Sequence, residues 1–175
     1  MIVAVHPTAL GPAAGGLRLW HYPDWRDGLT DALRLSTAMT AKFAVAGLPS
    51  GGGKAVVVLP EGTVPEPDRR RAVLDDVADT IESLGGAYAT GPDVGTGSDD
   101  MAVIGRITPH VFCRPAHLGG SGDSSPHTAR RSPRCAPSAG GCTAPSGWTD
   151  AGWPWPVWVG SARASPGCSP PRAPP

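Results

Sequence analysis

The chain has 175 residues and carries 15 basic and 15 acidic side chains, so its formal net charge is zero. A neutral chain gives no sign of the basic surface that nucleic acids or anionic membranes would require. No apolar run approaches the roughly 20 residues that span a bilayer, and the N-terminus lacks the pattern of a signal peptide. We therefore expect a cytoplasmic protein with at most one domain of ordinary size.

The four cysteines do not show the spacing of a metal site or of a disulfide framework. No C-x-x-C pair occurs among them, and the histidines do not cluster with them. The sequence therefore predicts no bound metal and no disulfide scaffold.

The first third of the chain predicts a strand, a loop and a long helix. Ile2 to Val5 has the apolar character of a strand, and the next block, through Gly15-Gly16-Leu17-Arg18, is expected to be a loop followed by a short extended run. Asp24 is a suitable N-cap for a helix that we expect to run to about Ala38.

Strands and helices continue to alternate after this helix, which is typical of an α/β fold. Ala55 to Leu59 reads as a buried strand, and a second helix opens within Pro65 to Asp68 and ends at Gly85-Gly86. A short strand, Ala87 to Thr90, and a third helix capped by Ser98 to Asp100 complete the pattern. Val111-Phe112 is a further candidate strand. The apolar stripe of the second helix is expected to face the core; it consists of Val73, Leu74, Val77, Ala78, Ile81 and Leu84.

Met39 to Val58 is the segment with the clearest chemical content. Lys42 and Lys54 lie on either side of three consecutive glycines, which we interpret as a small-residue turn that allows a close backbone approach. A phosphate-binding P-loop does not fit, because Leu48 stands where that motif needs glycine and Ala55 where it needs Ser or Thr. From spacing alone, a glycine-rich turn with solvated lysines remains an equal alternative.

Four blocks of sequence, in order, resemble the amino-acid dehydrogenase superfamily, in its leucine/valine/phenylalanine branch. They are Thr8 to Arg18, Met39 to Val58, Gly91 to Thr96 and Gly119 to Thr128. The resemblance covers residues 2 to about 129. It implies an N-terminal substrate and dimerisation domain over residues 1–129, with a mainly β-sheet core flanked by helices, and a homo-oligomeric enzyme.

The same resemblance implies roles for individual residues. Lys54 would be the catalytic lysine, Lys42 the lysine that binds the substrate carboxylate, and Asp93 the acid/base. Thr128 would contact the nicotinamide carboxamide of NAD. Positions matching the family's substrate pocket are Gly15, Gly16, Met39 and Gly91. Taken without the resemblance, the two lysines read as solvated surface side chains, Asp93 as a turn carboxylate, the glycines as turn residues and Met39 as a core residue.

Residues 130–175 have a different composition from the rest of the chain. From residue 131 onward lie ten of the 21 prolines and four of the six tryptophans, with no Leu, Ile, Met, Phe, Lys or Glu. Such a stretch cannot build a core, so we expect it to be disordered, without a Rossmann cofactor domain.

An out-of-frame translation of GC-rich DNA would explain this tail. When the last base of each codon is read with the first two bases of the next, Trp148-Thr149 must encode Asp, the two Trp-Pro pairs must encode Ala, and Trp158-Val159 must encode Gly. Those forced codons fit a strand that leads into the G-x-G-x-x-G fingerprint of dinucleotide-binding domains.

Two functional readings follow. The first is an NAD-dependent dehydrogenase for a branched-chain or aromatic L-amino acid. The second is an inactive fragment without a cofactor domain, which at most binds an amino acid.

Overall fold

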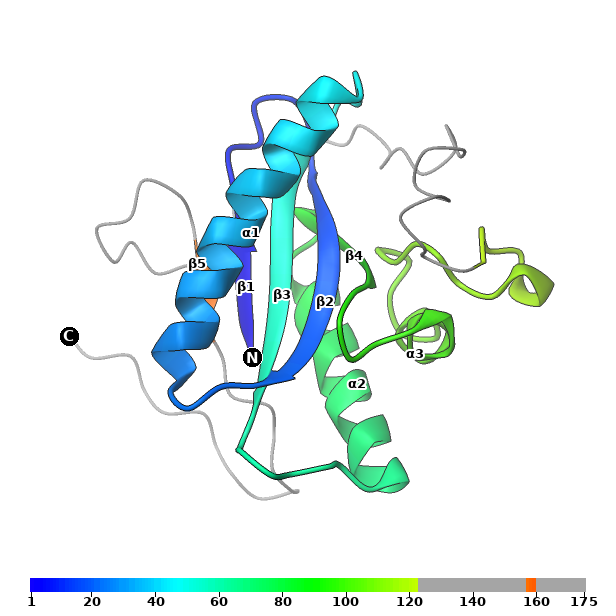
Figure 1. The fold of residues 1–175 in the computed structure, drawn as a ribbon. Coiled ribbons are helices and arrows are strands. Elements are labelled where there is room, and N and C mark those ends of the chain that lie inside the picture. The colour runs from blue at the N-terminus through cyan, green and yellow to red at the C-terminus, as the bar shows by residue number, and fades with distance from the viewer. Residues whose placement is uncertain (123–156, 160–175) are drawn as a thin grey trace.

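A computed structural model describes residues 1–122 and 157–159 (Figure 1). The elements are β1 (Ile2–Val5), β2 (Ala13–His21), α1 (Trp25–Val45), β3 (Gly51–Leu59), α2 (Pro67–Ser83), β4 (Tyr88–Pro92), α3 (Ser98–Ile104), the 3-10 turn η1 (Ala116–Leu118) and β5 (Val157–Val159). This order of strands and helices confirms the predicted α/β class. No helix of the described residues is both long enough and apolar enough to cross a membrane.

The five strands form one sheet in the order β4-β2-β3-β1-β5. β2, β3 and β4 run parallel, while β1 is antiparallel to both β3 and β5. The connection from β2 to β3 moves one way across the sheet, and the connection from β3 to β4 moves the other way. Because crossovers between parallel strands are right-handed, the two helices are expected on opposite faces. Figure 1 shows this arrangement, with α1 across the near face and α2 behind the sheet.

Alternate residues of the strands serve these two faces. On β1, Val3 belongs to the cluster that packs on α2, whereas Ile2 belongs to the cluster that packs on α1. On β3, Ala55 and Val57 face α2, and Val56 faces α1. The α2 face holds the larger core, and the predicted apolar stripe of α2 contributes to it as expected. This alternation places Lys54 on the α1 face, two residues before Val56.

The predicted glycine turn is wrong, because Gly51–Gly53 are the first residues of β3. Small residues are still required there, for a packing reason. A Cβ on Gly52 would collide with the backbone of α1 at Ser36 and Thr40, and a Cβ on Gly53 would lie 2.5 Å from the ring of Tyr88. The glycines therefore allow the helix and a buried aromatic ring to approach the strand closely.

Two other elements are longer than predicted. Asp24 is the N-cap of α1 as expected, and its side chain accepts a hydrogen bond from the Arg26 amide, but the helix continues past Ala38 to Val45. No glycine or proline interrupts this stretch before Gly47, which has a φ of +67°. The expected loop and short extended run correspond to the nine-residue strand β2, whose N-terminal half includes the glycine pair.

The other predictions near the ends of elements have mixed outcomes. Gly85, with a φ of +58°, follows the C-cap of α2. α3 has Gly97 as its N-cap in place of Ser98, and the Asp100 carboxylate accepts the Gly97 amide. Val111 forms only an isolated bridge with Thr90, so the candidate strand there is wrong.

Of the tail, the structure describes Val157–Val159 alone, which form β5 beside β1. The disorder expected for the other residues of 130–175 lies outside the described residues.

Candidate active site

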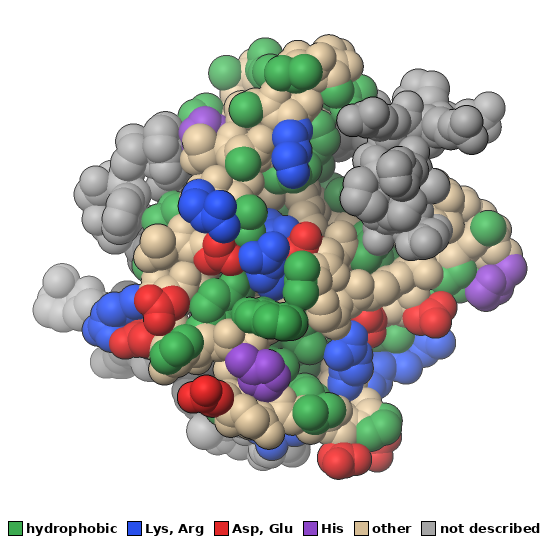
Figure 2. Space-filling view, in the orientation of Figure 1, with side chains coloured by type: hydrophobic (Ala, Val, Ile, Leu, Met, Phe, Trp, Pro, Cys, Tyr) green, Lys and Arg blue, Asp and Glu red, His purple; other side chains and the backbone are tan. Residues whose placement is uncertain are grey.

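The site is built on the α1 face of the sheet, where three charged side chains meet. Lys54 projects from β3, and Arg18 projects from the neighbouring parallel strand β2. Asp93 is the first residue after β4, on the other side of β2. Because parallel strands end at the same edge of a sheet, Asp93 lies beside the part of β2 that pairs with β4. Figure 2 shows basic and acidic side chains side by side near the centre of this face.

Lys54 is buried and paired with Asp93. Its side chain is 5% exposed, and its Nζ lies 2.8 Å from Asp93 Oδ2. Burial lowers the pKa of Lys54, and the positive charge of Arg18 lowers it further, while the bond to Asp93 opposes both effects. A buried lysine with a lowered pKa is suited to proton transfer and to stabilising an oxyanion.

The Asp93 carboxylate receives two cations on one oxygen. Arg18 Nε donates to Asp93 Oδ2 at 2.8 Å, the oxygen that also accepts Lys54. Burial alone would raise the pKa of Asp93, but the hydrogen bonds and charges of Lys54 and Arg18 outweigh it and hold that pKa below its ordinary value. In the described part of the chain, no side chain or backbone amide donates to Asp93 Oδ1. Among these residues, Oδ1 is therefore left available as a hydrogen-bond acceptor.

A second carboxylate continues the network on α1. Asp31 Oδ2 accepts from Arg18 Nη1 at 2.5 Å and from the Tyr22 hydroxyl at 2.7 Å. Arg34 donates to the other Asp31 oxygen at 2.7 Å. These residues also line an open hollow of about 310 Å³ between α1 and β2, together with Trp20, Asp27 and Thr30. The charged network therefore reaches from the buried lysine to the surface.

The loop that carries Asp93 is fixed from two sides. Thr96 Oγ1 accepts the Asp93 amide and donates to the carbonyl of Leu17 on β2. From α2, Arg70 makes two hydrogen bonds to Asp100 and one to the carbonyl of Gly95. These contacts fix the backbone of Asp93 at a set position beside Lys54.

Of the three glycines predicted to line the pocket, one borders this pair. A Cβ on Gly16 would be 2.7 Å from the Cβ of Asp93 and 3.1 Å from Lys54 Nζ, so glycine is needed for the pair to form beside β2. A Cβ on Gly15 would collide with the Gly53 carbonyl, and one on Gly91 with the ring of Phe112. Gly15 thus allows β2 to lie close to β3, and Gly91 allows the Phe112 ring to pack on β4. Of the three, only Gly16 lies against the charged pair.

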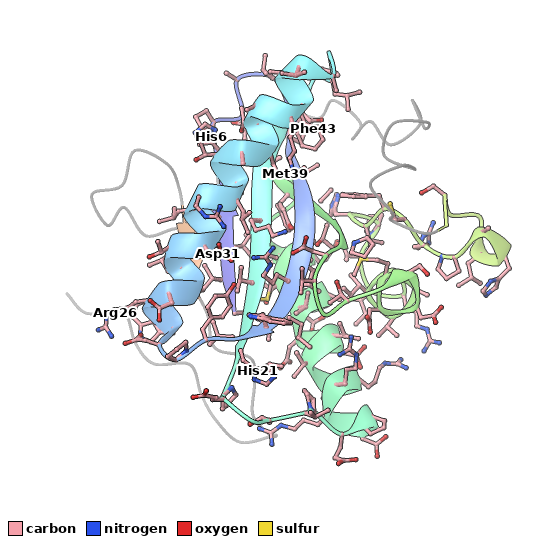
Figure 3. All side chains as sticks on the ribbon, in the orientation of Figure 1. His6, His21, Arg26, Asp31, Met39 and Phe43 are labelled. Carbon is pink, nitrogen blue, oxygen red and sulfur yellow. The ribbon has the colours of Figure 1, made fainter. Side chains whose placement is uncertain are left out.

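The structure does not bring Lys42 or Met39 into contact with the charged pair. Lys42 is exposed in the last turn of α1, and Met39 is half-buried one turn earlier. Asp31, Met39 and Phe43 follow one another along α1 in Figure 3. Lys42 is eleven positions after Asp31, so both lie on the same side of the helix, about 16 Å apart along its axis. Thr128 lies outside the described residues.

Sequence reasoning missed three members of the network: Arg18, Asp31 and Tyr22. Arg18 was visible as the last residue of the block Thr8 to Arg18, and its place two residues after Gly16 puts it on the same strand face. Asp31 and Tyr22 gave no comparable signal, because their partner comes from a different element.

The described residues show neither a metal-ligand cluster nor a dinucleotide-binding fingerprint. Residues 1–122 and 157–159 contain no group of three or more His, Cys, Asp or Glu side chains placed to bind a metal ion. A dinucleotide fingerprint needs a glycine turn between a strand and a helix. Gly51–Gly53 do not fit it, since they lie within β3 and strand residues follow them.

Residues 1–110 match the family model for the Glu/Leu/Phe/Val dehydrogenase dimerisation domain. The chain belongs to this dehydrogenase family. Its dimerisation domain is the part that carries Lys54, Arg18 and Asp93, which confirms the predicted superfamily and fold.

Similarity to known members of the dehydrogenase family indicates the branch to which the chain belongs. The chain is 43% identical over 128 residues to the leucine dehydrogenase of Geobacillus stearothermophilus, covering 73% of this chain and 34% of that protein. It is 43% identical over 129 residues to the phenylalanine dehydrogenase of Lysinibacillus sphaericus, covering 74% and 33%. These relatives support the leucine/valine/phenylalanine branch.

A solved structure agrees with the fold. The L-tryptophan dehydrogenase from Nostoc punctiforme superposes with a TM-score of 0.56 at 39% identity, over 63% of this chain and 31% of that one. The chain thus spans about a third of the length of the curated dehydrogenases it matches.

Proposed function

We propose that this domain is the substrate domain of an NAD-dependent dehydrogenase that oxidatively deaminates a branched-chain or aromatic L-amino acid to its 2-oxo acid and ammonia. The observation that carries the proposal is the buried Lys54, 2.8 Å from Asp93, on a sheet face that a glycine leaves uncrowded. Membership in the dehydrogenase family supports the reaction class.

The reaction needs groups of this kind. NAD, when bound, would supply the hydride acceptor for the Cα–H bond of the amino acid; water would then add to the resulting imine, and the carbinolamine would release ammonia. Lys54, with its lowered pKa, would take a proton from the attacking water and stabilise the carbinolamine oxygen. Asp93 would exchange protons with the amine through Oδ1, the oxygen that the described residues leave available.

Lys42 and the pocket residues would bind the substrate. The Lys42 ammonium, on the same side of α1 as Asp31, is a candidate partner for the substrate carboxylate. Met39 and the surfaces near Gly16 and Gly91 would receive an apolar side chain, which favours a branched or aromatic amino acid over glutamate. Gly91-Pro92 before Asp93, by contrast, resembles the glutamate dehydrogenase version of the family.

NAD would have to be held outside the described residues, because their glycines do not fit a dinucleotide. Thr128 is the one residue of this chain for which we propose a nicotinamide contact. We also propose that residues 130–175 are an out-of-frame translation of the cofactor domain. Sequencing the gene tests this directly, since an undisturbed reading frame around codon 130 would contradict it.

A second candidate function is a module that binds an amino acid without catalysing its conversion. It is favoured by the fact that the substrate-side groups lie within residues 1–93, whereas the dinucleotide fingerprint is not among the described residues. The family's name as a dimerisation domain supports a homo-oligomer for either reading.

Binding and turnover should be measured separately on the 175-residue chain. Calorimetric titration with leucine, valine and phenylalanine reports binding, and absorbance of reduced nicotinamide after addition of NAD reports turnover. We expect binding without turnover, and turnover once the reading frame is restored near codon 130.

The Lys54→Met variant is the decisive comparison, with Arg71→Met on the exposed side of α2 as its control. In the frame-restored protein, Lys54→Met should abolish turnover and Arg71→Met should preserve it. Full turnover in a folded Lys54→Met protein would overturn the proposed role of Lys54.

A further inference from the structure

We propose that Arg18 is a positioning residue that holds the Asp93 carboxylate against Lys54. The proposal rests on the proposed function for its view of Lys54 and Asp93 as the reacting groups. Its structural basis is independent of turnover: one guanidinium joins Asp93 on the loop after β4 to Asp31 on α1.

The bond from Arg18 decides which Asp93 oxygen is used. Arg18 Nε and Lys54 Nζ both lie 2.8 Å from Oδ2. Two donors on the same oxygen fix the rotation of the carboxylate and turn Oδ1 away from them. A single donor would leave the carboxylate free to rotate, so Lys54 alone cannot set this orientation.

Asp31 keeps the guanidinium in place. It accepts from Arg18 Nη1 and is itself held by Tyr22 and Arg34. Arg18 is thus gripped at two of its nitrogens by carboxylates from different elements. The rigid planar fork of arginine suits this bridge, whereas the single ammonium of lysine does not present two fixed donors in a plane.

The charged and titratable groups around Lys54 come from three elements. β2 contributes Arg18, α1 contributes Asp31, and the loop after β4 contributes Asp93. Asp31 in turn faces Arg34 and Tyr22. Loss of Arg18 should have two opposite effects on the pKa of Lys54. Removing a nearby positive charge favours the protonated lysine, but releasing Asp93 takes away its counter-ion while the burial remains.

This opposition gives a sharp test on the full 175-residue chain. Lys42 and Lys54 are its two lysines, so labelling lysine with carbon-13 at Cε gives two NMR signals. A pH titration then follows Lys54 with the exposed Lys42 as an internal reference. For Arg18→Met we expect the pKa of Lys54 to fall below its value in the unsubstituted chain, because Asp93 leaves the ammonium. A Lys54 pKa that is unchanged or higher would show that Arg18 acts through its charge alone, and would overturn the proposal.

Two further variants separate position from charge. Arg18→Lys keeps the charge but not the fork, so it should also lower the pKa of Lys54; recovery of the original titration would contradict the proposal. Asp31→Asn releases the anchor and should shift the Lys54 titration in the same direction by less. If Arg18→Met does not fold, Asp31→Asn replaces it as the test. An unchanged Lys54 titration in folded Asp31→Asn would then contradict the proposal.

Arg71→Met is the matched control and should leave both lysine signals in place. The titration uses no amino acid and no NAD, so its outcome does not depend on binding or turnover. Failure of the proposed function would leave the predicted shift intact, and failure of the shift would leave binding and turnover to be judged separately.

Discussion

The two faces of the central sheet use the same strands for different purposes. On the α2 face, alternate residues of β1, β2 and β3 pack with the apolar stripe of α2 into the larger core cluster. On the α1 face the buried apolar cluster is small, and the neighbouring positions of β2 and β3 are Gly16, Arg18 and Lys54. One face is a packed core, and the other combines a modest core with a charged site.

The difference shows how a lysine can be buried among charged partners on one face of a sheet whose other face is apolar. Lys54 lies on β3, whose opposite face packs into the apolar core. The packing of that core offsets the unfavourable free energy of burying the lysine. Changes on the α2 face should therefore alter stability and spare the geometry of the site. Changes on the α1 face should alter the geometry of the site, with a smaller loss of stability than a large cavity on the α2 face.

The largest expected effect is on the α2 face. Ile81 is fully buried on α2, so Ile81→Ala removes apolar contacts and leaves a cavity. We expect the free energy of unfolding to fall by about 2–5 kcal/mol. Urea unfolding measures it, and the Lys54 titration should not move in the folded fraction. A shift of that titration would mean that the two faces are not independent.

A smaller loss is expected from crowding the α1 face. Gly16→Ala places a methyl group 2.7 Å from the Cβ of Asp93 and 3.1 Å from Lys54 Nζ, so one of the two must move. We expect a stability loss of about 1–3 kcal/mol, together with a shifted Lys54 titration. The control is Gly97→Ala, where no heavy atom lies within 4 Å of the added Cβ. An unaltered Lys54 signal in Gly16→Ala would show that the site tolerates the methyl group.

Local signals in the sequence predicted most of the elements. The N-cap Asp24, the apolar stripe of α2 and Gly85 after its end are short-range features, and each is found where expected. Lys54 and Asp93 were chosen through the family blocks, and the structure brings them into contact.

The failures have a common cause, which is long-range packing. Gly51–Gly53 read as a turn because the sequence does not show that α1 and Tyr88 press against them from two sides. Asp31 could not be linked to Arg18, because a helix surface aspartate looks the same whether or not a strand places an arginine beside it. Contacts between elements are decided by topology, and local periodicity does not report them.

Acid should weaken the fold through Asp93. Its pKa in the folded chain is lowered, since Lys54 and Arg18 outweigh the effect of burial. A carboxylate with a lowered folded-state pKa stabilises the fold above its unfolded value and loses that contribution as the pH falls. We expect the free energy of unfolding to decline more steeply below about pH 5 in the original chain than in Asp93→Asn. Ile81→Ala is the control: it should be less stable throughout, with the original slope. Equal slopes for Asp93→Asn and the original chain would contradict the assigned shift.

The smallest effect is expected away from both faces, at an ion pair of the α2 surface. Arg71 Nε lies 3.2 Å from Asp75 Oδ1, one turn apart, and both side chains are more than 40% exposed. Solvent screens such a pair, so Arg71→Ala should cost only about 0.3–0.5 kcal/mol. Arg18 pairs with Asp93 at a comparable distance of 2.8 Å, but these side chains are 18% and 25% exposed. If chemical denaturation gave equal losses for Arg71→Ala and Arg18→Ala, the α1 network would be a surface feature and the contrast between the faces would fail. A clearly larger loss for Arg18→Ala would place that network among the interactions that hold β2, α1 and the Asp93 loop together.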